Sequence, residues 1–80
     1  MNQEEVLKDL IKIFVETLDN EQINLTPETT AGQVEGWDSL SHVMLVVEIE
    51  KHFNIRFTSK EIQSWQNVGE LVENIVIKRS

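Results

Sequence analysis

Apolar positions recur three or four residues apart over residues 3–18, the spacing of an amphipathic helix. Asn2 precedes this run and Glu5 lies three positions later, an arrangement typical of a capped helix N-terminus. The apolar members of the run are Leu7, Leu10, Ile11, Phe14 and Leu18. The pattern therefore predicts a first helix that buries one face.

Two further helices are predicted in the last third of the chain, the first of them short. One covers residues 59–64, with Thr58 and Glu61 as its cap pair. The other begins after Asn67, with Glu70 completing its cap. No alternating run typical of a strand is longer than a few residues, so we expect an all-α fold. Together with a helix over residues 39–53, the elements make a small four-helix bundle of three longer helices and one short helix.

The helix predicted over residues 39–53 begins behind Asp38, a favoured N-cap residue, and ends at Asn54. At about 100° per residue it carries two apolar stripes on nearly opposite sides. The stripe expected to face the core contains His42, Leu45, Val46, Ile49 and Phe53. The second stripe contains Leu40, Val43, Met44 and Val47.

A domain of this size cannot easily bury both stripes of one helix. Either a neighbouring loop covers the second stripe, or the stripe is exposed and docks partner proteins. Glu35, Asp38 and Glu48 lie near it, and an acidic rim steers association with basic partners. We therefore favour a docking face.

Residues 19–38 show no sustained period and form a predicted connection of about 20 residues, which is long for a compact domain. Thr26 and Pro27 are expected to start a single helical turn within it. The apolar residues expected to anchor this loop against the helices are Ile23, Leu25, Val34 and Trp37.

Composition and charge exclude several classes of function. The 80 residues, taken as one domain spanning 1–80, contain no cysteine, so any thiol chemistry must be carried by an added group. Seven basic residues against 14 acidic ones give a net charge of −7, which disfavours nucleic acid as a partner. No apolar stretch approaches the ~18 residues of a membrane span, and we expect a cytoplasmic monomer without membrane insertion.

One segment carries candidate chemistry, namely Gly36-Trp37-Asp38-Ser39-Leu40. It places the Ser39 hydroxyl at the first position of a helix, where unpaired backbone N–H groups and the helix dipole favour a phosphate ester. We interpret Ser39 as a modification site. No base, metal or oxyanion group accompanies it, so the chain is not expected to be an enzyme.

The run GWDSLSHVMLVVEIEKHFNIRF resembles the region around the prosthetic-group serine of the acyl carrier protein family. The predicted order of helices resembles that family over most of the chain. The resemblance implies a discrete carrier whose Ser39 bears 4′-phosphopantetheine, donated by coenzyme A through a phosphopantetheinyl transferase. It also implies that Asp38 assists recognition, and that acyl-loading and acyl-transferring enzymes are partners. The thioester chemistry would then take place on the thiol of the 4′-phosphopantetheine group, which forms a flexible arm.

The sequence departs from fatty-acid carriers of this family in one respect. Their motif helix is typically more acidic, whereas here the next acid after Asp38 is Glu48. A specialised biosynthetic pathway is therefore at least as good a hypothesis as general fatty-acid synthesis. The alternative function is a small helical protein–protein adaptor without a prosthetic group. A metal site at His42, Glu48 and His52 is disfavoured because no further ligand clusters with them.

Overall fold

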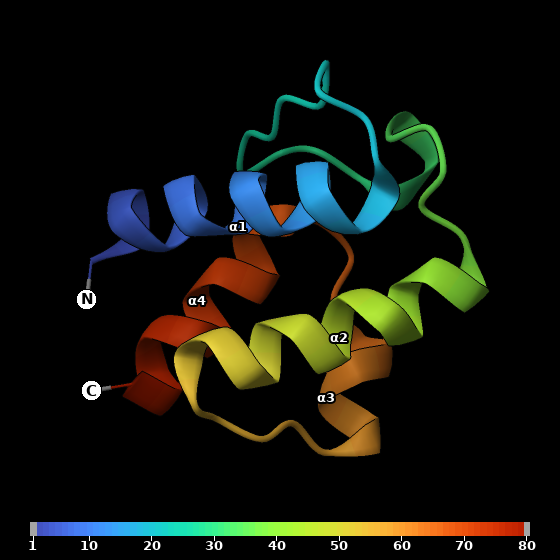
Figure 1. Cartoon of the computed structure of the whole chain (residues 1–80). Helices are drawn as coiled ribbons and strands as arrows, with labels where there is room; N and C mark the ends of the chain where they lie inside the picture. Colours follow the sequence, from blue (N-terminus) through green and yellow to red (C-terminus); the bar gives the residue numbers. More distant parts are fainter. Residues whose placement is uncertain (1, 80) are drawn as a thin grey trace.

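The computed structural model describes residues 2–79 and shows an all-α fold, with no strand in that range (Figure 1). Its helices are α1 (Gln3–Leu18), the 3₁₀ helix η1 (Ala31–Gln33), α2 (Ser39–Phe53), α3 (Ser59–Ser64) and α4 (Val68–Arg79). The predicted fold of three longer helices, one short helix and a long loop before α2 is confirmed. None of the described helices is long and apolar enough to cross a membrane.

The ends of the two long helices follow from local backbone chemistry. The N–H of Glu5 donates to Asn2 Oδ1 at 2.8 Å, which satisfies one unpaired donor at the start of α1. Asp19 and Asn54 follow α1 and α2 in left-handed conformations, with φ of 51° and 56°. Asp and Asn tolerate this region better than other side-chain-bearing residues, so both helices end where the sequence predicts.

Side-chain caps also fix the starts of α3 and α4. Thr58 Oγ1 accepts from the Glu61 N–H at 3.1 Å, and Glu61 Oε1 accepts from the Thr58 N–H at 2.8 Å. At α4, Asn67 Oδ1 accepts from the Glu70 N–H at 2.9 Å. The predicted starts of both helices are confirmed.

The core lies where α1 packs against both α2 and α4 (Figure 1). The helix α2 runs antiparallel to α1 and buries Leu45, Ile49 and Phe53 against it and its neighbours. The predicted core stripe is therefore confirmed, with half-buried His42 at its edge. The most deeply buried large side chains are Phe14, Leu10, Leu45, Ile49, Leu71, Ile75, Val6 and Val68.

The loop between α1 and α2 is anchored as predicted, with Leu25 and Val34 buried. The expected helical turn after Thr26-Pro27 is wrong. Pro27 and Glu28 form a simple turn, closed by a bond from the Thr29 N–H to the Thr26 carbonyl at 3.0 Å. The helical turn comes later, at η1, because Thr30 and Gln33 bond each other reciprocally across it.

The same loop closes onto the start of α4. The Val68 N–H donates to the Thr29 carbonyl and the Gly69 N–H donates to the Pro27 carbonyl, both at 2.8 Å. Two N–H groups of the first turn of α4 are thus satisfied by loop backbone. Gly69 permits this approach, since a Cβ there would lie 2.9 Å from the Pro27 carbonyl oxygen.

Candidate functional site

The chain enters α2 through a sharp change of direction at Gly36. Its φ of 89° lies in the region that favours glycine. The Gly36 carbonyl accepts a hydrogen bond from Ser41 Oγ at 2.7 Å. The loop before the motif is therefore held against the first turn of the helix that it precedes.

Asp38 and Ser41 form a reciprocal cap at the start of α2. One carboxylate oxygen of Asp38 accepts from the N–H groups of Leu40 and Ser41 at 3.0 and 2.9 Å. Ser41 Oγ in turn accepts from the Asp38 N–H at 2.8 Å. The Ser41 N–H is the main cause that lowers the pKa of the Asp38 carboxyl below its ordinary value. The prediction that Asp38 caps α2 is confirmed, whereas the sequence reasoning missed Ser41; the Asp-x-x-Ser spacing was the available signal.

Ser39 lies between these cap residues but takes no part in the cap. Its side chain is exposed. Within residues 2–79, its hydroxyl makes no hydrogen bond, while the hydroxyl of Ser41 makes bonds to Gly36 and Asp38. Of the two serines in the first turn, only Ser39 offers a hydroxyl that a large group can take without breaking a local bond.

The expectation that the first-turn N–H groups are unpaired is wrong for Leu40 and Ser41, because the Asp38 carboxylate already occupies both. A phosphate at Ser39 would also lie close to that negative charge. The fit to a phosphoester arm therefore rests on the exposed hydroxyl of Ser39 and on the positive end of the helix dipole. The residues present fit the group on those two grounds.

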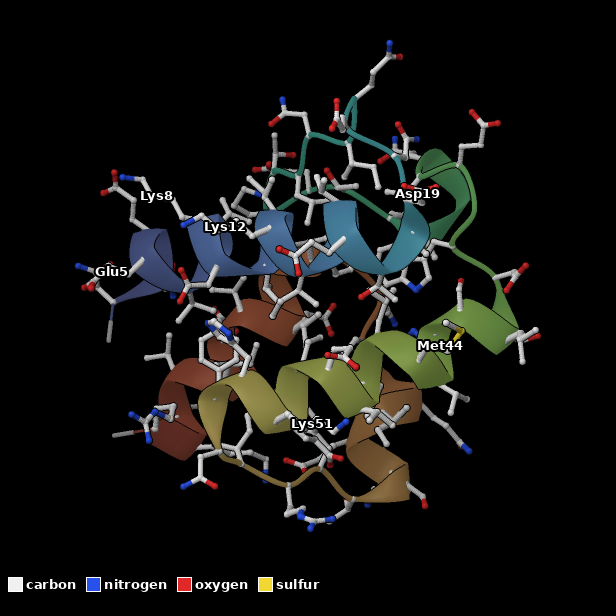
Figure 2. The ribbon with its side chains drawn as sticks, in the orientation of Figure 1. Glu5, Lys8, Lys12, Asp19, Met44 and Lys51 are labelled. Carbon is white, nitrogen blue, oxygen red and sulfur yellow. The ribbon has the colours of Figure 1, made fainter. Side chains whose placement is uncertain are left out.

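The second stripe of α2 is exposed rather than covered by the loop. The exposed fractions are 74% for Leu40, 61% for Val43, 50% for Met44 and 41% for Val47. Met44 points outward from the first half of α2 (Figure 2). The structure thus excludes the alternative in which the loop covers the stripe.

Acidic side chains border this stripe from α2, from α1 and from the turn before α2. Glu35 and Glu48 are exposed, as a rim would require. A shallow depression joins the stripe to α1; Val43, Met44, Val47 and Glu48 line it together with Glu16 and Thr17 of α1. The two α1 residues were not singled out from the sequence, because periodicity within α2 does not show which residues of another helix lie beside it.

The two histidines have different partners. His42 Nδ1 accepts from Trp37 Nε1 at 3.0 Å, and His52 Nε2 lies 3.1 Å from Asp9 Oδ2 of α1. No group of three potential metal ligands occurs in the described part of the chain. Trp37 packs against the core, as predicted for a loop anchor, and Trp65 packs against it as well.

Comparison with known proteins identifies the family. The model of the phosphopantetheine attachment site family matches residues 8–75. An acyl carrier protein of Helicobacter pylori is 30% identical over 70 residues, 88% of this chain and 90% of that protein. The chain belongs to the acyl carrier protein family. It is a non-catalytic carrier, and its prosthetic group is a covalently bound 4′-phosphopantetheine.

Other comparisons agree with this assignment. An acyl carrier protein of Rubrobacter xylanophilus is 29% identical over 76 residues, 95% of this chain and 94% of that protein. The solution structure of a holo acyl carrier protein from Geobacter metallireducens superposes with a TM-score of 0.85 at 41% identity. That match covers 91% of this chain and 84% of the other. The fold and the family therefore rest on separate comparisons.

Proposed function

We propose that Ser39 is the attachment residue and that this carrier presents acyl groups, held on its arm, to partner enzymes. The observation that carries the assignment is the exposed, unbonded hydroxyl of Ser39 at the first position of α2. In the attachment step Ser39 Oγ bonds to the phosphorus that bears pantetheine in coenzyme A. The pyrophosphate bond breaks, adenosine bisphosphate leaves, and a base of the transferase takes the hydroxyl proton. The arm supplies a thiol that holds the acyl group as a thioester.

In this proposal Asp38 has two tasks. Its carboxylate fixes the first turn of α2, which sets the direction in which Ser39 points. One of its oxygens accepts both cap bonds, so the other is available to a phosphopantetheinyl transferase. The cap bonds that lower the pKa of this carboxyl also hold it in place beside Ser39.

We assign partner docking to the exposed face of α2. Leu40, Val43, Met44 and Val47 supply apolar contact beside Ser39, and Glu35 and Glu48 supply negative charge at the edge. Such a surface suits partners that combine an apolar patch with basic residues. The transferase and the acyl-loading and acyl-transferring enzymes would each read it in turn.

We further propose that the carrier serves a specialised biosynthetic pathway. The support is the composition of the exposed face. Residues 40–47 contain no acidic residue, and the first acidic residue of α2 is Glu48. Partners of this carrier would then depend more on apolar contact than on charge. We place the carrier in the cytoplasm, because coenzyme A, the donor of its arm, is an intracellular cofactor. We also propose that it acts as a monomer, with residues 1–80 as one domain around a single core.

Intact mass after incubation with coenzyme A and a broad-specificity transferase tests the attachment. We expect a single adduct of roughly 340 Da, the mass of one phosphopantetheine. Ser39→Ala should gain nothing, whereas Ser41→Ala, the matched control two positions further along α2, should still be modified. An adduct on Ser39→Ala would move the site elsewhere. A folded wild type that gains no adduct would favour the adaptor function.

A further inference from the structure

A cluster of two indoles and one imidazole lies beside the attachment serine. Trp37 Nε1 donates to His42 Nδ1 at 3.0 Å, and the two rings stack with planes 19° apart. The ring of Trp65 meets His42 edge-on, with centroids 5.9 Å apart. We call Trp37, His42 and Trp65 the indole–imidazole cluster.

His42 ties this cluster to α3 as well. Because Nδ1 accepts from Trp37, the proton of the neutral imidazole is on Nε2. That nitrogen lies 3.4 Å from the Ile62 carbonyl oxygen of α3. One side chain of α2 therefore joins the loop before α2 to the helix after it.

Two further rings extend the cluster to other parts of the fold. Phe14 of α1 packs edge-on against Trp37, and Phe57 packs edge-on against Trp65, each with centroids 4.8 Å apart. Phe14 is fully buried. The row of rings thus runs from the core at α1, across the first turns of α2, to the segment before α3.

His42 places this row about one helical turn from Ser39. His42 follows Ser39 by three positions, so their Cβ atoms are neighbours, about 5–6 Å apart, on α2. Two hollows that border α2 share Val47; one extends to Glu16 and Thr17 of α1, and the other to Ile55 and Arg56 beyond the end of α2. The core behind His42 is filled by fully buried Leu45 and Phe14.

We propose that Trp37, His42 and Trp65 close the interior of the bundle to the cargo, so that the acyl chain stays outside the core. This inference rests on the proposed attachment at Ser39. Entry of a chain between α2 and α3 would part His42 from the Ile62 carbonyl and from the ring of Trp65. Passage between α2 and the preceding loop would break the bond between Trp37 and His42, leaving two half-buried ring nitrogens without their partner. The exposed stripe of α2 offers apolar surface with no such disruption.

Chain-length dependence of thioester cleavage tests this inference. The protein is loaded with acetyl- or octanoyl-phosphopantetheine, and loading at Ser39 is checked by intact mass. Cleavage by hydroxylamine is then measured for each form and divided by the rate of the matching free pantetheine thioester. We expect the two normalised wild-type rates to agree within about twofold, because an exposed thioester is not shielded from the solvent.

Variants test the cluster itself. His42→Ala opens space between the indoles, and Trp65→Leu does so separately in case the first variant fails to fold. At least one should slow cleavage of the octanoyl form by about fivefold or more relative to the acetyl form, because a chain can now be buried away from solvent. Lys12→Ala, on the exposed side of α1 and outside both the cluster and the docking face, should leave the two rates equal.

The outcomes separate the two proposals. Slow cleavage of the octanoyl form in the wild type overturns this inference and leaves the attachment at Ser39 intact. Equal rates in the wild type and in both cluster variants overturn the role of the cluster. A wild type that gains no adduct at Ser39 overturns the proposed function and this inference with it.

Discussion

At the scale of single residues, two serines in one helical turn have opposite roles. Ser41 donates to the Gly36 carbonyl and accepts from the Asp38 N–H, so its hydroxyl belongs to the structure. Ser39 is exposed and its hydroxyl bonds to nothing among residues 2–79. A carrier needs this division, because the hydroxyl that accepts the arm must be free while the turn that presents it stays rigid.

The stability of the unmodified protein should reflect these roles. Ser39→Ala should change the free energy of unfolding by less than about 0.5 kcal/mol, since an exposed side chain without partners is lost. Ser41→Ala should cost about 1 kcal/mol, because it removes one half of a reciprocal cap. Urea unfolding of both variants checks this. A larger loss for Ser39→Ala than for Ser41→Ala would show that the Ser39 hydroxyl is structural.

Gly69 gives a second residue-scale prediction. Gly→Ala inside an exposed helix usually stabilises by about 1 kcal/mol. At Gly69 the new Cβ would lie 2.9 Å from the Pro27 carbonyl oxygen, so Gly69→Ala should instead destabilise by about 1–2 kcal/mol. Gly32→Ala is the matched control, since nothing lies within 4 Å of its Cβ position. Equal thermal midpoints for the two variants would contradict the close approach of loop and α4.

At the scale of elements, the sequence predicts what depends on neighbours along the chain. The helix bounds follow from periodicity and caps, and the two faces of α2 follow from angles alone. Contacts across long separations do not follow. The bonds from the loop to the start of α4 join residues about 40 positions apart, such as Thr29 and Val68, and no local pattern encodes them. The Asp38 cap was predicted, but the N–H groups that it occupies were also counted as free for a phosphate. An N-cap residue and an anion site use the same donors, so the two predictions could not both hold.

The Glu61 carboxylate links the short helix α3 to α4. Glu61 accepts from the Thr58 N–H at 2.8 Å, from Asn74 Nδ2 at 3.0 Å, and lies 3.0 Å from Lys78 Nζ. The Thr58 N–H above all, then Asn74 and Lys78, lowers the pKa of Glu61 from 4.5 to about 2. Six residues of α3 alone would not form a stable helix, so this carboxylate gives the element much of its fixed position.

Low pH should weaken the contacts of Glu61 with Asn74 and Lys78, because these contacts favour the ionised carboxylate. Between pH 4.5 and about 2 the unfolded chain binds a proton at Glu61 that the folded chain does not, so stability rises with pH in that window. The contribution is complete above pH 4.5 and is lost as pH falls toward 2. We expect Glu61→Gln to flatten the fall in the urea midpoint over that window relative to wild type. Glu73→Gln serves as control for the loss of one negative charge, and an unchanged slope in Glu61→Gln would contradict this account.

At the scale of the whole molecule, charge and apolar surface are unevenly distributed. The stretch between Lys12 and Lys51 contains eight acidic residues and no basic one. It includes both acidic residues proposed for the docking face, Glu35 and Glu48. The start of α1, where Glu5 lies, is at the opposite end of the molecule from Met44 (Figure 2). The negative charge of Glu35 and Glu48 therefore lies near the proposed attachment residue, Ser39, where it can steer a basic partner. Glu4 and Glu5 carry two negative charges at the other end and allow a comparison.

Electrostatic attraction between the carboxylates of Glu35 and Glu48 and a basic transferase should be measurable as kcat/KM of the modification reaction. The double variant Glu35→Gln, Glu48→Gln should lower kcat/KM for a basic transferase by about three- to tenfold at low salt, because the rim speeds encounter. The difference should shrink at about 0.3 M salt, where the Debye length is shorter. Glu4→Gln, Glu5→Gln makes the same change in net charge at the far end of α1 and should have little effect. Equal losses in the two double variants would mean that the transferase senses only the overall negative charge, and would refute a docking rim on α2.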